Sequence, residues 1–140
     1  MSAVQFHVPG KPVAWARAGK NGKVSFTLAP QRAYGELVKV AAREAMAGRA
    51  PFAGAVALAC EFVFPIAKSW ALKKKRAALA GDIFPTGKPD WDNAGKIISD
   101  ALNAIAWRDD AQVADGRVTK RYGERAGCWV TVTPYTEIGG

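Results

Sequence analysis

The sequence predicts an α+β fold, a single two-layer domain in which helices pack on a mixed β-sheet. The 140 residues suffice for one domain with a sizeable core, and the composition, 49% hydrophobic and 23% charged, is that of a globular protein. Segments with strand-like alternation are interleaved with segments of helical spacing, and Pro and Gly separate them. We therefore expect residues 1–140 to form one domain with the element order β-β-α-β-α-α-β-β.

Two strands are predicted at the N-terminus. Val4, Phe6 and Val8 alternate with polar residues, and a Pro-Gly turn signal follows them. The short segment 23–27 predicts a second strand. Residues 11–23, which are rich in glycine and basic side chains, would then form the loop of a hairpin.

A long helix is predicted from Pro30, which is tolerated in a first turn, to Gly48, which favours a helix end. Its apolar stripe consists of Tyr34, Leu37, Val38, Ala41 and Ala45. Residues 55–64 are predicted to form a central strand that stops at Pro65. The residues of its apolar parity are Val56, Leu58, Cys60, Phe62 and Phe64.

The second half of the chain is predicted to contain two helices and then two strands. Ser69 is the expected N-cap of a short helix that contains Lys73–Arg76, and residues 81–88 form a loop. A longer helix is expected over residues 92–105, with the apolar face Ile97, Ile98, Ala101, Leu102 and Ile105. The two closing strands are residues 113–122 and 128–134.

The composition excludes several classes of protein and of metal site. No apolar run approaches the ~20 residues of a membrane span, and the N-terminus lacks a signal-peptide pattern, so we expect a soluble cytoplasmic protein. Cys60 and Cys128 are too few for a four-thiolate zinc site, and we expect both to be buried core thiols. His7 is the only histidine and is expected to be structural. Any metal chemistry must therefore use carboxylates.

The charge distribution favours a polyanionic ligand. The net charge is +8 and the pI is about 9.8, and the excess of basic residues lies in residues 1–80. Two basic clusters are expected to bind the phosphates of such a ligand: Arg17, Lys20 and Lys23 in one, and Lys73, Lys74, Lys75 and Arg76 in the other. The alternative is a basic protein whose charges are only solvated.

Six of the twelve acidic residues are aspartates between positions 90 and 115: Asp90, Asp92, Asp100, Asp109, Asp110 and Asp115. Asp90 and Asp92 flank the start of a predicted helix, where alternate residues of an extended segment point to the same side. Lys96 and Asp100 follow on that side of the helix.

Only one residue of the adjacent pair Asp109 and Asp110 is expected to join this group, because neighbours in an extended segment point to opposite sides. Converging carboxylates repel each other, and a divalent cation removes the repulsion. Hard oxygen ligands select Mg²⁺, or Mn²⁺ in its place. The alternative is that these aspartates are surface caps and turn residues.

These segments together resemble the signature of the RusA family of Holliday-junction resolvases. The resemblance rests on three runs with characteristic gaps: Lys88-Pro-Asp-Trp-Asp-Asn-Ala-Gly-Lys96, Asp100-Ala-Leu-Asn103 and Asp109-Asp-Ala-Gln-Val113. It extends from about residue 4 to residue 134. Three positions depart from the family pattern: Ala94 replaces a larger apolar residue, Ala104 stands where a glycine is common, and Arg17 lacks the second arginine of the family's segment. Gly95 is expected to weaken the helical turn that follows Ala94.

The resemblance implies a homodimeric, Mg²⁺-dependent endonuclease that resolves four-way DNA junctions by paired nicks in recombination and repair. Residue by residue, the metal-binding aspartates of the family fall on Asp90, Asp92 and Asp110, and its catalytic lysine falls on Lys96. Two simpler roles for Lys96 stay open, an ion pair with Asp92 or Asp100 and an ordinary phosphate contact.

Two other functions remain as alternatives. A non-catalytic DNA-binding module would need the basic clusters but would have no use for the grouped aspartates. A carboxylate-metal phosphohydrolase that acts on nucleotides would need the aspartates, but a net charge of +8 would be unusual for it.

Overall fold

Four strands form one mixed sheet in the order β1-β4-β2-β3 in the computed structural model, which describes residues 3–13 and 24–136. The strands are β1 (Val4–Pro9), β2 (Val56–Phe64), β3 (Val113–Tyr122) and β4 (Gly127–Pro134). β4 pairs antiparallel with β1 and with β2, whereas β2 and β3 are parallel. The predicted α+β class with a mixed sheet is confirmed, and the 55–64 segment is an interior strand as expected.

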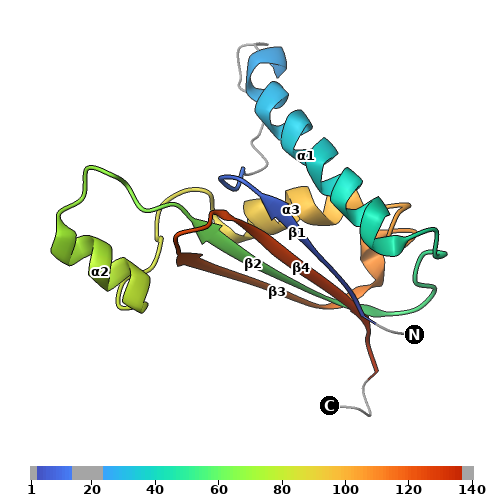
Figure 1. Cartoon of the computed structure of the whole chain (residues 1–140). Coiled ribbons are helices and arrows are strands. Elements are labelled where there is room, and N and C mark those ends of the chain that lie inside the picture. The colour runs from blue at the N-terminus through green and yellow to red at the C-terminus, as the bar shows by residue number, and fades with distance from the viewer. Residues whose placement is uncertain (1–2, 14–23, 137–140) are drawn as a thin grey trace.

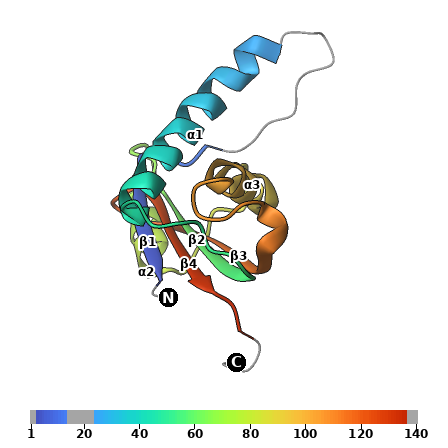
Figure 2. The ribbon, with the colours of Figure 1, turned by 90° about the vertical axis from the view of Figure 1, so that its right-hand side faces the viewer.

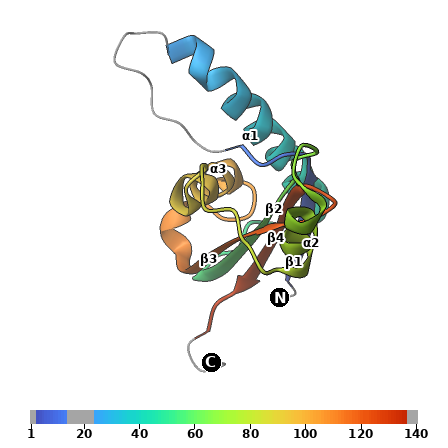
Figure 3. The same cartoon turned by 90° about the vertical axis from the view of Figure 1, so that its left-hand side faces the viewer.

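Two long helices, α1 (Val24–Met46) and α3 (Trp91–Leu102), cover one face of this sheet (Figures 1 and 2). The third helix, α2 (Leu72–Ala80), lies beyond the end of the sheet at which β2 and β3 finish (Figures 1 and 3). A one-turn 3₁₀ helix, η1 (Asp110–Gln112), leads directly into β3 and contacts α3. The start of α3, η1 and β3 therefore lie close together.

The core lies between the sheet and the two long helices. The alternating residues of β2 from Val56 to Phe64 are all buried, and so are Val4, Phe6 and Val8 of β1. Cys60 and Cys128 are buried free thiols, as the sequence predicts. On the helical side, α3 contributes Ala94, Ile97, Ile98, Ala101 and Leu102.

The predicted second strand is wrong. Lys23 lies outside the described residues, but residues 24–27 are the first residues of α1, and Pro30 stands inside this helix rather than in its first turn. The alternation in this segment is too short to distinguish a strand from a helix. The observed order is therefore β-α-β-α-α-β-β.

Three smaller expectations also need correction. The buried stripe of α1 follows a spacing of four, Tyr34, Val38, Ala42 and Met46, and leaves Leu37 52% exposed, because the helix packs along a narrow line. The N-cap of α2 is Ala71 rather than Ser69, without a side-chain capping hydrogen bond. Helix α3 ends at Leu102, so Ile105 packs against the core from the following turn.

Gly95 explains how α3 approaches the sheet so closely. A Cβ built at Gly95 would lie 2.9 Å from Cγ2 of Val118 on β3, closer than such carbon atoms pack. The sequence predicts only the helix-weakening effect of this glycine. In the structure its missing side chain is what lets the first turns of α3 lie against β3.

We predict that Gly95→Ala and Gly35→Ala have opposite effects on stability. Ala is about 1 kcal/mol better than Gly inside a helix, and at Gly35 in α1 nothing lies within 4 Å of the added methyl group. At Gly95 the stiff Val118 side chain must move, which costs about 1–3 kcal/mol. In urea denaturation, the free energy of unfolding should be higher than that of the parent for Gly35→Ala, but not for Gly95→Ala. An equal gain in both variants would contradict this packing.

Candidate active site

The start of α3 carries the first half of the site. Asp90 is the N-cap residue of α3, yet its side chain makes no capping hydrogen bond. Asp92 lies in the first turn, where the positive end of the helix dipole favours a carboxylate. Lys96 lies one turn further along the helix. Asp90, Asp92 and Lys96 are all exposed.

A cavity of about 280 Å³ between α3, η1 and β3 brings three of the predicted residues together. Asp92 and Lys96 line it from α3, and Asp110 lines it from η1. The other polar side chains on its wall are Ser99 and Arg117, and its apolar lining includes Leu58, Trp91, Val113 and Val118. Residues 18 positions apart in sequence thus share one surface.

The two adjacent aspartates have different tasks. The carboxylate of Asp109 caps η1 by accepting a hydrogen bond from the Ala111 N–H at 3.1 Å, and the Gln112 side chain completes a capping box. Gln112 also donates to the carbonyl oxygens of Phe52 and Gly54, at 2.8 and 2.9 Å, which ties η1 to the start of β2. This turn leaves Asp110 to face α3.

The surroundings of Asp110 disfavour its negative charge. A side-chain hydrogen bond with Asp109, partial loss of hydration and the charges of Asp109 and Asp100 raise the pKa of Asp110, and Lys96 acts in the opposite direction. The backbone N–H of Ala111 lowers the pKa of Asp109. Asp110 therefore lies where a nearby cation would be stabilised electrostatically.

Asp90 lies on a second cavity of about 350 Å³, which adjoins the first at Trp91 and Asp92. In residues 3–13 and 24–136, no three His, Cys, Asp or Glu side chains are gathered tightly enough to hold an ion together. Mg²⁺ usually keeps several waters and binds one or two carboxylates. Asp92 and Asp110 line one cavity and carry the carboxylates that such a hydrated ion binds, so their role as ligands, like that of Asp90 as a third ligand, stays a prediction.

Lys96 forms one of the two ion pairs that the sequence leaves open, the pair with Asp100. Its Nζ lies 3.6 Å from Oδ2 of Asp100, and the two side chains are 47% and 43% exposed. An i, i+4 pair of this exposure contributes only about 0.3–0.5 kcal/mol. The pair therefore does not account for the position of Lys96 on the same cavity as Asp92 and Asp110.

Lys120 is a residue of the site that sequence reasoning missed. Its Nζ donates to the carbonyl oxygens of Gly87 and Pro89, both at 2.8 Å, and the side chain lines the Asp90 cavity. It therefore fixes the segment that leads into Asp90. One signal was available, because Lys120 has the parity of Val118 and Tyr122 and so lies on the otherwise apolar, helix-facing side of β3.

Arg117 was also missed, and it has the opposite parity to Lys120. It forms a two-point contact with Asp115, with nitrogen–oxygen distances of 3.2 and 3.3 Å, and it is one of the residues that line the Asp92 cavity. β3 is the edge strand of the sheet, so residues of either parity lie near its open edge.

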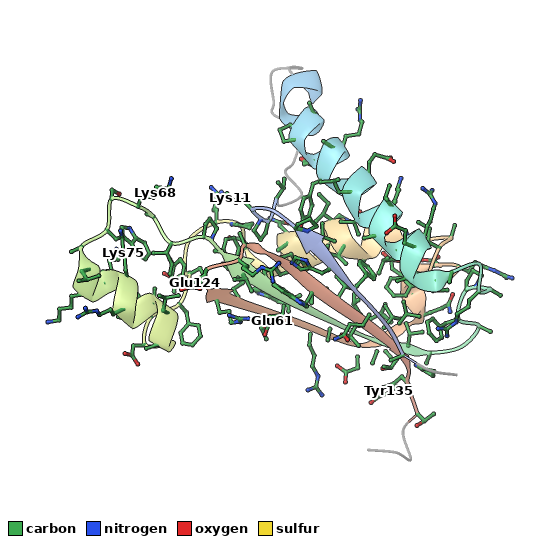
Figure 4. The ribbon with its side chains drawn as sticks, in the orientation of Figure 1. Lys11, Glu61, Lys68, Lys75, Glu124 and Tyr135 are labelled. Atoms are coloured by element: carbon green, nitrogen blue, oxygen red, sulfur yellow. The ribbon has the colours of Figure 1, made fainter. Side chains whose placement is uncertain are left out.

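The basic residues divide into those near the site and those at a distance. Arg17, Lys20 and Lys23 lie outside the described residues. Lys73, Lys74 and Arg76 are exposed on α2, and Lys74 lies 4.0 Å above the ring of Trp70. Lys11 and Lys88 line a cleft of about 360 Å³ between the site and the segment that leads into α2. Figure 4 shows Lys11, Lys68 and Lys75 toward the α2 end of the molecule.

Most of the chain matches a known protein family. Residues 9–133 match the family described as endodeoxyribonuclease RusA. The chain belongs to the RusA family. It is also 34% identical over 129 residues to the uncharacterized protein YqaN of Bacillus subtilis. The aligned region covers 89% of this chain and 91% of YqaN. RusA proteins are endodeoxyribonucleases that act on junction DNA. Within the described residues, no helix has the length and apolarity needed to cross a bilayer.

Replacing Lys120 tests its anchoring role. We expect Lys120→Met to destabilise the protein by about 1.5–3 kcal/mol, because hydrogen bonds from a charged donor are lost and two carbonyl groups lose their partner. Lys88→Met is the matched control, since it removes the same charge from an exposed position nearby. Chemical denaturation gives the loss of stability, and amide exchange over residues 86–92 locates it. Equal behaviour of the two variants would contradict the anchoring role.

Proposed function

We propose that this RusA-family protein is an Mg²⁺-dependent, structure-selective endonuclease that resolves four-way DNA junctions by paired nicks. The observation that carries the proposal is the single cavity shared by Asp92, Asp110 and Lys96, because it combines carboxylates for a hard cation with an ammonium group for phosphate. Mn²⁺ is expected to replace Mg²⁺.

Each residue has a separate part in the proposed reaction. Asp92 and Asp110 would hold the cation, with Asp90 as the third predicted ligand from the adjoining cavity. When bound, Mg²⁺ supplies a Lewis acid that activates water and neutralises phosphate charge. Lys96 would stabilise the additional negative charge of the transition state, and it would do so from the same wall of the cavity.

Basic side chains would supply most of the affinity for DNA. The net charge of +8 attracts a polyanion, and Lys11 and Lys88 lie in the cleft between the site and the approach to α2. The α2 cluster, Lys73–Arg76, would bind phosphates at a greater distance from the site. These contacts position the DNA but carry no chemistry.

A homodimer is part of the proposal. Paired nicks on two strands need two identical sites, and a two-fold symmetric dimer matches the approximate two-fold symmetry of a four-way junction. Leu37 and Val40 on α1, about half exposed and one turn apart, give this helix an apolar surface that a second copy could cover.

Incubation with three substrates separates the proposal from its alternatives. A synthetic four-way junction, a linear duplex of the same sequence and a nucleoside triphosphate are each treated with the protein, with and without Mg²⁺. We expect cleavage of the junction alone and only with Mg²⁺. Junction binding without cleavage would indicate a DNA-binding module, and hydrolysis of the nucleotide would indicate a phosphohydrolase.

Substituting Asn for Asp tests the two carboxylates on the cavity. Asp92→Asn and Asp110→Asn should each abolish junction cleavage in Mg²⁺, with binding retained or tightened because phosphate repulsion is reduced. Asp109→Asn is the control, since this carboxylate caps η1 and should mainly affect stability. Cleavage gels and gel-shift titrations give both readouts. An inactive Asp109→Asn beside an active Asp110→Asn would reverse the assignment.

Lys96→Ala distinguishes a role in the transition state from the ion pair with Asp100. We expect near-normal folding and junction affinity, and a single-turnover cleavage rate lower by orders of magnitude at saturating protein. Lys96→Arg should restore the rate only in part, because a planar guanidinium does not reproduce a compact ammonium group. A rate for Lys96→Ala within a few-fold of the parent would exclude Lys96 from catalysis.

A further inference from the structure

Trp91 has an unusual position among the tryptophans of the described residues. Trp107 is fully buried and donates to Oδ1 of Asn103 at 2.7 Å, Trp129 lies on His7 with ring centroids 4.0 Å apart, and Trp70 packs edge-on against Tyr122. Trp91 is 64% exposed, and within residues 3–13 and 24–136 no other aromatic ring or cationic group stacks on its indole ring.

The exposed ring of Trp91 lies beside the two cavities of the candidate site. Trp91 stands between Asp90 and Asp92 at the start of α3, and it is a lining residue both of the Asp92 cavity and of the Asp90 cavity. A single exposed apolar residue is ordinary on a protein surface. An aromatic ring on the wall between two cavities of a DNA-cutting site is, in contrast, within reach of any strand whose phosphate enters either cavity.

We propose that Trp91 is a stacking platform for a nucleobase next to the phosphate that is cut, an inference that rests on the proposed function. The occupant is a base rather than another phosphate, because the flanking carboxylates repel anions whereas a neutral base has an apolar face that matches the indole ring. Bases stack on aromatic side chains without regard to sequence.

This contact also selects the structure of the substrate. In a continuous duplex each base is already stacked on its neighbours, so its face is not accessible to Trp91 unless energy is spent on unstacking. At the point where strands exchange in a branched DNA, bases are more readily unstacked. Trp91 therefore favours branched over linear DNA, whereas the basic side chains bind both through phosphates.

A junction with 2-aminopurine at the point of strand exchange is the probe for this contact. It is titrated with variants in an Asp92→Asn background so that no cleavage occurs. We expect 2-aminopurine fluorescence to fall on binding when residue 91 is Trp, and less so for Trp91→Leu. Junction affinity should drop about 5- to 150-fold for Trp91→Leu, be largely retained for Trp91→Phe, and stay unchanged for linear duplex.

Phe84→Ala is the matched control, because Phe84 is 56% exposed in the loop before α3 and is not among the residues that line these two cavities. It should behave like the parent. If the parent binds the junction but Trp91→Leu has the same affinity and fluorescence change, the stacking role is wrong and the proposed function stands. If the protein with Asp92 and Trp91 both intact neither binds nor cuts the junction, the stacking role and the proposed function both fail. Equal losses for Phe84→Ala and Trp91→Leu would also overturn the specific role of Trp91.

Discussion

The close approach of α3 to β3 is the constraint on which the site depends. Gly95 has no side chain to hold the helix away from Val118, so the first turns of α3 lie directly over the edge strand. Asp92 and Lys96 stand on either side of this contact along the helix, and η1 brings Asp110 to them from the start of β3. A wider separation would leave the carboxylates on two unrelated surfaces.

Near this contact, the side chains that hydrogen-bond to the backbone are different from the side chains that the proposed reaction uses. Asp109, Gln112 and Lys120 are engaged with backbone groups, and they fix η1 and the segment before Asp90. The capping residue of α3, Asp90, makes no side-chain capping bond. The scaffold does not use the Asp90 carboxylate as a cap, and Asp90 and Asp92 both line the cavity in front of the start of α3.

The charge distribution separates attraction of DNA from the chemistry on it. A protein with a net charge of +8 attracts a polyanion as a whole, whereas the grouped aspartates repel phosphate at one place. In the proposed function a divalent cation would reverse this local repulsion, and productive binding of DNA would then depend on the cation. The proposed stacking on Trp91 would add an uncharged contact at the same place, and this contact would not compete with phosphate for the basic groups.

Much of this arrangement was predictable from the sequence, and the parts that were not have physical reasons. The parity of β2 and the apolar face of α3 are strong periodic signals. The family resemblance implies a site of Asp90, Asp92, Lys96 and Asp110, and the structure places three of them, Asp92, Lys96 and Asp110, on one cavity, while their roles stay predictions. The segment 24–27 is too short for its periodicity to decide between strand and helix. Lys120 and Gly95 depend on which element lies opposite them, and that is known only once α3 is placed on β3.

Paramagnetic broadening by Mn²⁺ tests most directly whether α3 and η1 share one cation. In amide NMR spectra of the protein without DNA, sub-stoichiometric Mn²⁺ should broaden the signals of residues near Asp92 and near Asp110 together, at the same added concentration. Signals near Asp82, an exposed aspartate in the loop after α2, should stay sharp. Broadening at only one of the two segments, or equally at all aspartates, would contradict a shared site.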